Sequence, residues 1–277
     1  MKGRKLENKV IVISGGTKGV GRTMVEEYAR EGAKVVFGGR DQEAAHQALH
    51  IVKTYGNEGL FVHTDLENVN DCKKLFDEAF GRFGKIDGFF NYAGVTPVSP
   101  LDSCNEETFD SVMNINFKAA FFCCQQAVKY MSYTNKCMGG GKGGSIVLTG
   151  SPHAWGGEKD RAAYACSKGV LITLMEHIAK NYGENQIRCN YLALGWTPTD
   201  GEIALRVSQG SSEAELRREA AKVIPMGRMN EKSDYVGTLI HLMSDDSAMI
   251  SGSIIHATGG WWIGTSVQNR LNTTVRG

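Results

Sequence analysis

The chain has 277 residues, of which 42% are hydrophobic and 22% charged, and its formal net charge is +1. This composition is typical of a globular protein, and the near-zero charge gives no field to hold nucleic acid or an acidic membrane. Met1–Lys5 leads into Leu6-Glu7-Asn8 and not into a long apolar run. We therefore expect no secretory signal, no transmembrane segment and a cytoplasmic location.

Neither the cysteines nor the histidines indicate a metal site. The 7 cysteines include no CxxC pair, so buried reduced thiols are expected. His46 and His50 have helical metal spacing, but they lie in a polar, alanine-rich segment without a partner His or Cys nearby. A solvated helix face is the better interpretation, and no metal is expected.

The first predicted strand is the short apolar, β-branched run 9–14, and it ends in a glycine-rich turn that leads directly into a helical pattern. A strand, a glycine turn and a helix form the context of a dinucleotide-binding loop. The glycines let backbone amides approach a pyrophosphate, and the helix N-terminus favours its negative charge. The spacing is GxxxGxG. The loop residues assigned to the cofactor are Gly15, Thr17, Lys18, Gly19, Val20 and Gly21.

A second predicted strand, 33–37, closes on Gly38-Gly39-Arg40. An acidic residue in this place would hydrogen-bond the ribose of NAD, but the chain has Gly39 and Arg40 instead. With Lys18, Arg40 makes two cations that suit the extra phosphate of NADP(H), so NADP(H) is favoured over NAD(H). The alternative is that Arg40 is a surface residue at a strand end.

The elements that follow alternate between helix and strand. Asp41 caps a helix to about Tyr55, and strand 59–63, helix 71–83 and strand 86–91 come next. This alternation predicts a single Rossmann-type domain, 1–277, with a doubly wound parallel sheet of about seven strands and helices on both faces. Residues at the carboxyl ends of its strands should line one crevice, and these include Ser14, Asp65, Asn91 and Ser151.

A long helical region is predicted over 106–131, with an apolar stripe interrupted by Asn116. A polar side chain in such a stripe needs partners, so Asn116 is either a satisfied buried amide or part of a catalytic relay. A glycine-rich surface loop, 138–144, precedes strand 145–149, which ends at Gly150-Ser151. The remaining predictions are strand 187–192, a substrate lid 196–226 with a mobile helical segment, helix 233–243, strand 253–256 and a tail 261–277.

Tyr164 and Lys168 are four residues apart in the run 160–180, which lacks proline and has helical spacing. They therefore share one helix face, and the ammonium can lower the pKa of the phenol, which is ordinarily about 10. A phenol tuned in this way can exchange a proton with a carbonyl or an alcohol. Such a pair also occurs by chance, so it indicates a catalytic site only if the rest of the chain binds a hydride carrier.

Over residues 5–260 the chain resembles the short-chain dehydrogenase/reductase family. The family's glycine loop corresponds to Gly15–Gly21, its adenine-contacting acid to Asp65 and its NNAG turn to Asn91–Gly94. The resemblance implies a catalytic tetrad of Asn116, Ser151, Tyr164 and Lys168. It also assigns cofactor contacts to Asp65, Leu66, Asn91, Tyr92, Ala93, Gly94, Tyr164, Lys168, Gly195, Thr197 and Thr199.

The resemblance implies a role for each member of the tetrad. Tyr164 passes the proton, Lys168 lowers its pKa and binds the nicotinamide ribose, Ser151 bonds the substrate oxygen, and Asn116 holds a relay water. It also implies a dimer or tetramer, with apolar faces of 109–131 and 163–182 as candidate interfaces. Three positions depart from the family pattern: Tyr92 replaces an Asn, Leu194 a Pro, and Thr258 an Asp.

The favoured function is NADP(H)-dependent interconversion of a small-molecule ketone and a secondary alcohol. Aromatic residues near the crevice favour a bulky or cyclic substrate, such as a hydroxysteroid or cyclic ketone, unless they are core or oligomer contacts. Reduction of 3-oxoacyl thioesters and oxidation of sugars or polyols remain open, and enoyl reduction is less favoured. A non-catalytic NADP-sensing or scaffold protein is the alternative of another class. The substrate residues are assigned as Ser151, His153, Trp155, Tyr164 and Trp196.

Overall fold

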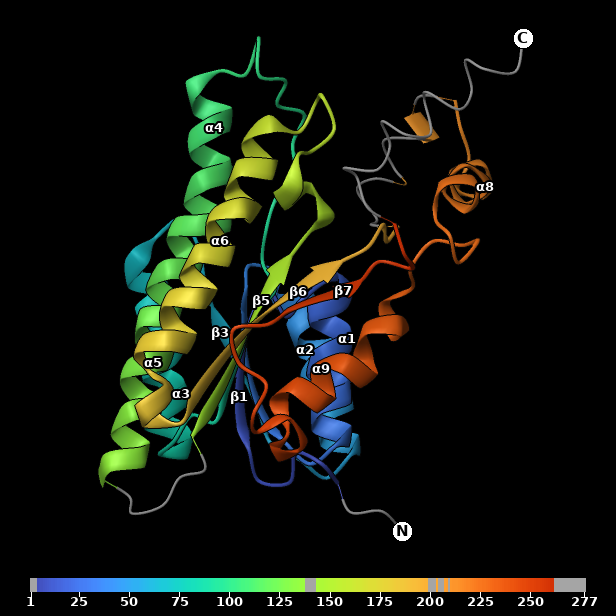
Figure 1. The fold of residues 1–277 in the computed structure, drawn as a ribbon. Helices are drawn as coiled ribbons and strands as arrows, with labels where there is room; N and C mark the ends of the chain where they lie inside the picture. Colours follow the sequence, from blue (N-terminus) through green and yellow to red (C-terminus); the bar gives the residue numbers. More distant parts are fainter. Residues whose placement is uncertain (1–3, 138–142, 199–202, 204–206, 209, 262–277) are drawn as a thin grey trace, which may run out of the picture.

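The computed structural model describes residues 4–137, 143–198, 203, 207–208 and 210–261. Within them the chain forms one parallel sheet of seven strands in the order β3-β2-β1-β4-β5-β6-β7 (Figure 1). This is the doubly wound order, in which the direction of winding reverses between β1 and β4. The strands are β1 Val10–Ser14, β2 Lys34–Gly39, β3 Gly59–His63, β4 Gly88–Asn91, β5 Gly144–Gly150, β6 Ile187–Leu194 and β7 Ile254–Ala257. The predicted fold class is confirmed.

Helices cover both faces of the sheet, with α3 to α6 on one face and α1, α2 and α9 on the other (Figure 1). The α-helices are α1 Gly19–Arg30, α2 Gln42–Thr54, α3 Val69–Phe83, α4 Glu106–Met113, α5 Ala119–Cys137, α6 Ala162–Asn181, α8 Glu213–Val223 and α9 Val236–Met243. The shorter elements are the π-helix η1 Asn114–Lys118 and the 3-10 helices η2 Pro152–Trp155, η3 Gly183–Asn185, η4 Lys232–Tyr235 and η5 Asp245–Ser247.

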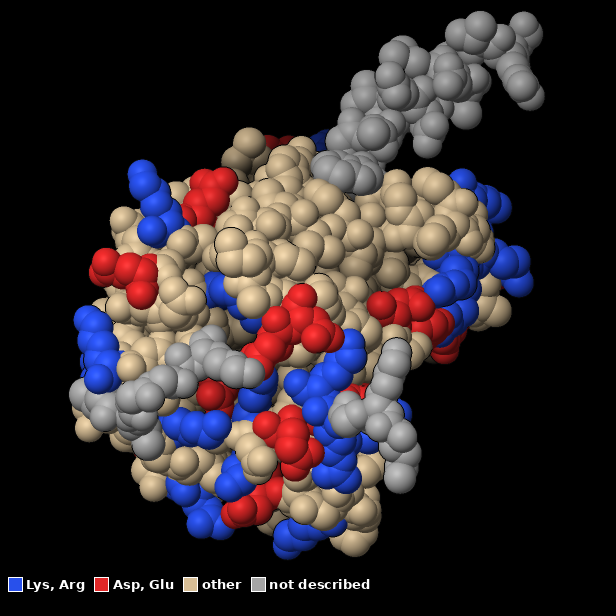
Figure 2. All heavy atoms as spheres, turned by 60° about the horizontal axis from the view of Figure 1, so that its bottom comes forward, with Lys and Arg blue, Asp and Glu red and all other residues tan. Residues whose placement is uncertain are grey.

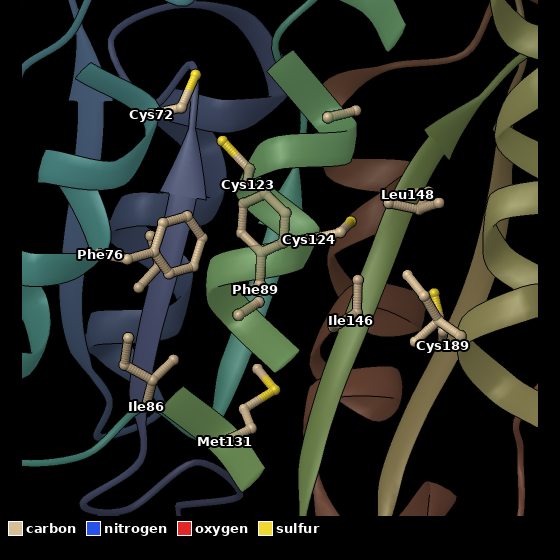
Figure 3. Close-up of a cluster of buried hydrophobic side chains, with 14 of the residues drawn as sticks. Cys72, Phe76, Ile86, Phe89, Cys123, Cys124, Met131, Ile146, Leu148 and Cys189 are labelled. Atoms are coloured by element: carbon tan, nitrogen blue, oxygen red, sulfur yellow. The ribbon is translucent and has the colours of Figure 1, made fainter. Parts of the chain in front are cut away.

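The central strands are buried on both faces, which explains why they are continuous apolar runs in the sequence. Every residue of β1 and of β5 is buried. One core fills the space between the sheet and α3, α5 and α6, where Phe76, Cys123 and Ile146 lie close together (Figure 3). A second core lies beneath α1, α2 and α9. Together they fix the ends of the strands, on which the candidate site is built.

The predicted long helical region over 106–131 is confirmed, but it is not one regular α-helix. The region is divided into α4, the π-helix Asn114–Lys118 and α5, which continues to Cys137. At the end of the π-helix, the backbone N–H of Ala119 bonds the carbonyl of Asn114, five residues earlier. Periodicity missed the change because one wide turn leaves the apolar stripe on either side intact. Such π turns occur frequently at functional sites.

Two of the predicted segments are described only in part. In the expected lid 196–226, α8 packs Leu216 and Ala220 into a small apolar cluster with Ile224 and Met229. Residues 199–202, 204–206 and 209 lie outside the described residues, as do most of the predicted glycine loop and all of the tail except Trp261.

The surface carries mixed charge. Figure 2 shows Lys and Arg interspersed with Asp and Glu over the face in view, consistent with a net charge of +1. None of the helices in the described ranges combines the length and apolar character needed to cross a bilayer. In the same part of the chain, no group of three or more His, Cys, Asp or Glu side chains gathers as metal ligands.

Candidate active site

The switch point between β1 and β4 brings the glycine turn beside the Asn91–Gly94 turn. The hydroxyl of Ser14 donates to Oδ1 of Asn91 at 3.0 Å. The backbone N–H groups of Tyr92 and Ala93 both donate to the carbonyl of Ser14, at 3.3 and 3.0 Å. Nδ2 of Asn91 is buried and has no hydrogen-bond partner among the described residues. The crevice therefore offers an unpaired donor at the place where a dinucleotide binds in this fold.

The glycine turn itself is a cradle that side chains would fill. Gly15 and Gly19 have φ angles of +79° and +58°, which favour glycine. A Cβ on Gly21 would lie 2.1 Å from the Gly15 carbonyl oxygen, and one on Gly19 would lie 2.3 Å from the hydroxyl of Tyr92. Tyr92 therefore packs its ring under the turn in place of the expected Asn. The cradle opens at the N-terminus of α1, so these residues fit a bound pyrophosphate.

At the adenosine end of the crevice, position 39 has no room for a side chain. A Cβ on Gly39 would lie 2.7 Å from Cγ2 of Thr17. Lys18 lies 3.4 Å from the carboxylate of Asp41, which also caps α2 through the N–H of Ala44. Arg40 and Asp65 are exposed at the ends of β2 and β3. This end therefore presents two cations, Lys18 and Arg40, and has a glycine instead of an acidic side chain at position 39, the last residue of β2.

Tyr164 and Lys168 occupy successive turns of α6, as their spacing predicts. Nζ of Lys168 lies 5.7 Å from the centroid of the Tyr164 ring and donates to the carbonyl of Thr149 at 2.9 Å. Burial lowers the pKa of Lys168 to about 8, so the ammonium persists at neutral pH. Burial also raises the pKa of Tyr164, against the lowering effect of its hydrogen bond with Ser151. The net direction is opposite to the lowered pKa expected from Lys168 alone, because desolvation outweighs the favourable partners.

Ser151 follows the last residue of β5 and is buried. Its backbone N–H donates to the hydroxyl of Tyr191 at 2.9 Å, and that hydroxyl lies 3.3 Å from the carbonyls of both Ser151 and Lys168. Tyr191 therefore ties the strand that carries Ser151 to the helix that carries Tyr164 and Lys168. The sequence analysis missed this residue, because its role depends on the neighbouring strand and helix.

Asn116 lies in the π-helix and is fully buried. Its side chain accepts from the N–H of Val95 at 2.8 Å and donates to the carbonyl of Val95 at 2.9 Å and to the hydroxyl of Ser167 at 3.0 Å. A Cβ on Gly94 would lie 3.1 Å from Oδ1 of Asn116 and 3.5 Å from Nζ of Lys168. The amide therefore joins the turn after β4 to α6, beside the Lys168 ammonium. Ser167 is a second residue that the sequence analysis missed.

The candidate substrate residues fall into two groups. His153 lies against the ring of Tyr164, at 5.5 Å between centroids, and Trp196 stacks on Trp261 at 5.7 Å. Trp155 instead packs against Tyr191 and His256, at 6.0 and 5.1 Å. The described contacts therefore bring His153 to the tetrad, and they place Trp155 against β6 and β7.

The turn after β6 is closely packed. Gly195 has no space for a side chain, since a Cβ there would lie 2.2 Å from Oδ1 of Asn230. The hydroxyl of Thr197 lies 2.5 Å from that of Tyr235. Thr199, the last predicted cofactor residue, lies outside the described residues. Of the other predicted cofactor residues, Tyr164 and Lys168 lie on α6, and Gly19, Val20 and Gly21 begin α1. The rest lie at the carboxyl ends of β1, β2, β3, β4 and β6 or in the turns that follow these strands.

Comparison with known proteins agrees with this geometry. Residues 15–262 match the profile of a family described as enoyl-(acyl carrier protein) reductase. A glucose and ribitol dehydrogenase homolog of Oryza sativa subsp. japonica is 30% identical, covering 92% of this chain and 86% of that protein. A 3beta-hydroxysteroid dehydrogenase of Mediterraneibacter gnavus is 27% identical over 93% and 96% of the two chains.

Among solved structures, levodione reductase superposes with a TM-score of 0.84 at 26% identity, covering 92% of this chain and 98% of that one. Fold, profile and relatives agree over nearly the whole chain, and the relatives are named dehydrogenases and reductases. The chain is therefore a member of the short-chain dehydrogenase/reductase family, an oxidoreductase that acts on CH–OH groups with a nicotinamide cofactor.

Proposed function

We propose that the protein is an NADP(H)-dependent oxidoreductase that interconverts a ketone and a secondary alcohol, with Tyr164 as the acid and base. One arrangement carries the proposal. The phenol of Tyr164 lies close enough to Ser151 for that side chain to lower its pKa, and it stands one helical turn from Lys168, at the sheet edge that holds the glycine turn. A proton donor, a hydroxyl for the substrate oxygen and a fixed cation therefore meet in one place.

When bound, the nicotinamide supplies or accepts the hydride. Tyr164 is a protonated phenol at neutral pH, because burial raises its pKa, so it can give its proton to a carbonyl oxygen. The Ser151 hydroxyl orients that oxygen, and the Lys168 ammonium stabilises the phenolate that remains. Asn116 fixes Val95 and Ser167 around Lys168. The relay water that the family resemblance assigns to Asn116 stays a prediction.

The preference for NADP(H) is supported by the adenosine end of the crevice. Lys18 and Arg40 are exposed cations there, and position 39 is a glycine packed against the Thr17 side chain, so no acidic side chain stands at the end of β2. A 2′-phosphate would take charge-assisted hydrogen bonds from both cations, whereas a free ribose hydroxyl would gain little from them.

A bulky or cyclic substrate is supported by the rings of His153, Trp196 and Trp261 on the substrate side. The names of two similar proteins, a 3beta-hydroxysteroid dehydrogenase and levodione reductase, agree with such a substrate. The rice relative, named a glucose and ribitol dehydrogenase homolog, supports a sugar or polyol as the second candidate.

The proposal also includes a cytoplasmic homo-oligomer, a dimer or a homotetramer. Phe109 of α4 and Phe121 of α5 are 46% and 42% exposed, and these rings form part of an apolar face that a second copy would cover. Light scattering on the purified protein measures the oligomer size directly, and a monomer would remove this part of the proposal.

The test of the function is an absorbance assay of NADPH oxidation over a panel of cyclic ketones, linear ketones and ketoses, repeated with NADH. We expect turnover on at least one ketone class, with a higher kcat/KM for NADPH than for NADH. An enoyl thioester in the panel tests the enoyl reduction that the family description names. NADPH binding without turnover on any compound would instead support the non-catalytic alternative.

A further inference from the structure

His153 is placed between the catalytic phenol and the start of the C-terminal tail. It lies two residues after Ser151 in η2, and its backbone N–H donates to the Ser151 hydroxyl at 3.3 Å. Its imidazole meets the ring of Tyr164 edge-on, at 5.5 Å and 77°, and the ring of Trp261 at 6.4 Å and 81°. The imidazole of His153 therefore packs against the ring of Tyr164, whose hydroxyl carries the transferred proton.

The hydrogen bonds of this imidazole assign its tautomer. Nδ1 accepts from the backbone N–H of Glu158 at 3.3 Å. A Cβ on Gly157 would lie 2.9 Å from Nδ1, so the absence of a side chain there lets the backbone approach the ring. In a neutral imidazole whose Nδ1 accepts, the proton is on Nε2. Among the described residues, Nε2 has no hydrogen-bond partner.

The ring stays neutral under physiological conditions. Burial, reinforced by the charge of Arg161, lowers the pKa of His153 to about 4. Arg161, whose charge acts on this imidazole, is itself ion-paired, because its Nη1 lies 3.6 Å from the Asp160 carboxylate. Among the described residues, the free donor beside Tyr164 is therefore Nε2–H of His153, and a purely hydrocarbon substrate flank would leave it unsatisfied.

Beyond His153 the substrate side is aromatic. Trp261 stacks on Trp196, with centroids 5.7 Å apart and ring planes 27° apart. Both rings pack on the apolar cluster formed by Leu216, Ala220, Ile224 and Met229. Flat ring faces next to a fixed N–H donor suit a cyclic compound that carries an oxygen, and they suit a flexible chain less well.

We propose that Nε2–H of His153 binds a second oxygen of the substrate, so that the preferred substrate is a cyclic ketone bearing a hydroxyl or carboxylate oxygen on a carbon near the carbonyl. The inference rests on the proposed function, because it places the reacting carbonyl at Tyr164 and Ser151. His153 then determines specificity without taking part in hydride or proton transfer. A half-buried donor of this kind discriminates against analogues that lack the acceptor, since the substrate would cover it and leave it unpaired.

The experiment combines substrate pairs with His153 variants. The neutral pair is 2-hydroxycyclohexanone and 2-methylcyclohexanone, which differ by a hydroxyl in place of a methyl group of similar size. The ionised pair is 3-oxocyclohexanecarboxylate and 3-isopropylcyclohexanone. kcat and KM are measured with NADPH for the wild type, His153→Phe, which keeps a ring without N–H, and His153→Gln, which keeps a donor. His46→Phe, at an exposed position on α2, is the matched control.

The wild type and His46→Phe should prefer the oxygenated member of at least one pair by about tenfold in kcat/KM, mostly through KM. In His153→Phe the ratio of kcat/KM between the two members of the pair should fall close to one. His153→Gln should retain part of the preference. The pair that shows the preference tells whether the oxygen is neutral or ionised. His153→Gln alone still gives the reduced preference if His153→Phe does not fold.

Equal preference in the wild type and both variants would overturn the inference, as would a wild type that favours the hydrocarbon member of both pairs. If the variants lower turnover of both members of a pair equally, His153 contacts the reacting oxygen and the inference is also wrong. Failure of the wild type to reduce any ketone while it binds NADPH is a different result, because it removes the proposed function first and the substrate assignment with it.

Discussion

Nζ of Lys168 lies 5.7 Å from the ring of Tyr164, yet its hydrogen bond goes to the carbonyl of Thr149 at 2.9 Å. The ammonium is therefore held by the strand that leads to Ser151, and its position does not depend on the phenol. Because the two groups are buried together, their protonation sets the pH range over which the enzyme works.

The first prediction concerns pH. The pKa of Lys168 is lowered to about 8 by burial, so the free enzyme carries the ammonium below pH 8 and loses it above. Because the charged form is the one that supports cofactor binding and the phenolate, kcat/KM for NADPH should fall as pH rises through about 8. Lys168→Arg keeps a charge at every pH, so its kcat/KM, although lower, should not fall as pH rises through about 8. Lys180→Arg, exposed on the same helix, should show the same fall in kcat/KM as the wild type. A wild-type profile that is flat to pH 10 contradicts the assignment.

Replacing Tyr164 with Phe should abolish turnover while NADPH still binds. The ring and its packing against His153 remain, and only the proton donor is lost. The expected decrease in kcat is at least about 10²- to 10⁴-fold. Fluorescence titration with NADPH measures the binding, and Tyr182→Phe at the end of the same helix is the control. Turnover close to that of the wild type would refute the mechanism.

Arg40→Ala should raise KM for NADPH by about tenfold or more and leave KM for NADH nearly unchanged. The change removes a charge-assisted hydrogen bond to the 2′-phosphate, a group that NADH lacks. Arg82→Ala serves as control, because Arg82 is an exposed arginine paired with Glu58 at the end of α3. The NADP assignment of Arg40 is wrong if the KM for NADPH does not change.

The fourth prediction separates a paired buried hydroxyl from an unpaired one. Tyr191→Phe leaves the buried N–H of Ser151 without its acceptor, so it should lower the free energy of unfolding by about 1–3 kcal/mol and also reduce kcat. Tyr28→Phe removes a hydroxyl that is buried without a hydrogen-bond partner among the described residues, so it should be neutral or stabilising. Urea denaturation of both variants gives the comparison. Equal losses in the two variants would remove the special role of Tyr191.

The sequence was sufficient for those parts of the site that depend on local spacing. The glycine turn, the pair Tyr164 and Lys168, and the strand ends at Ser14, Asn91 and Ser151 follow from periodicity and from glycine positions. These features fix a backbone shape within one turn or one strand, so a short stretch of sequence contains the information.

Features that join distant segments could not be predicted in this way. In the sequence Tyr191 has the pattern of an ordinary strand residue. Its hydroxyl accepts the hydrogen bond from Ser151 only because β6 lies beside β5 in the folded sheet. Tyr92 is predicted only as a cofactor contact in the turn after β4, yet its ring also lies under Gly19. The rise in the pKa of Tyr164 was missed for the same reason, since desolvation depends on every element packed around the phenol.

The wide turn at Asn114–Lys118 has a consequence for how this region tolerates change. A single-residue deletion there would restore regular α-helical hydrogen bonding, and so would stabilise the helix taken alone. Because each residue of an α-helix turns the chain by about 100°, the same deletion would swing α4 round relative to α5 and carry the Asn116 amide away from Val95 and Ser167. We expect a shortened chain of this kind to work poorly, because the amide could no longer join the turn after β4 to α6.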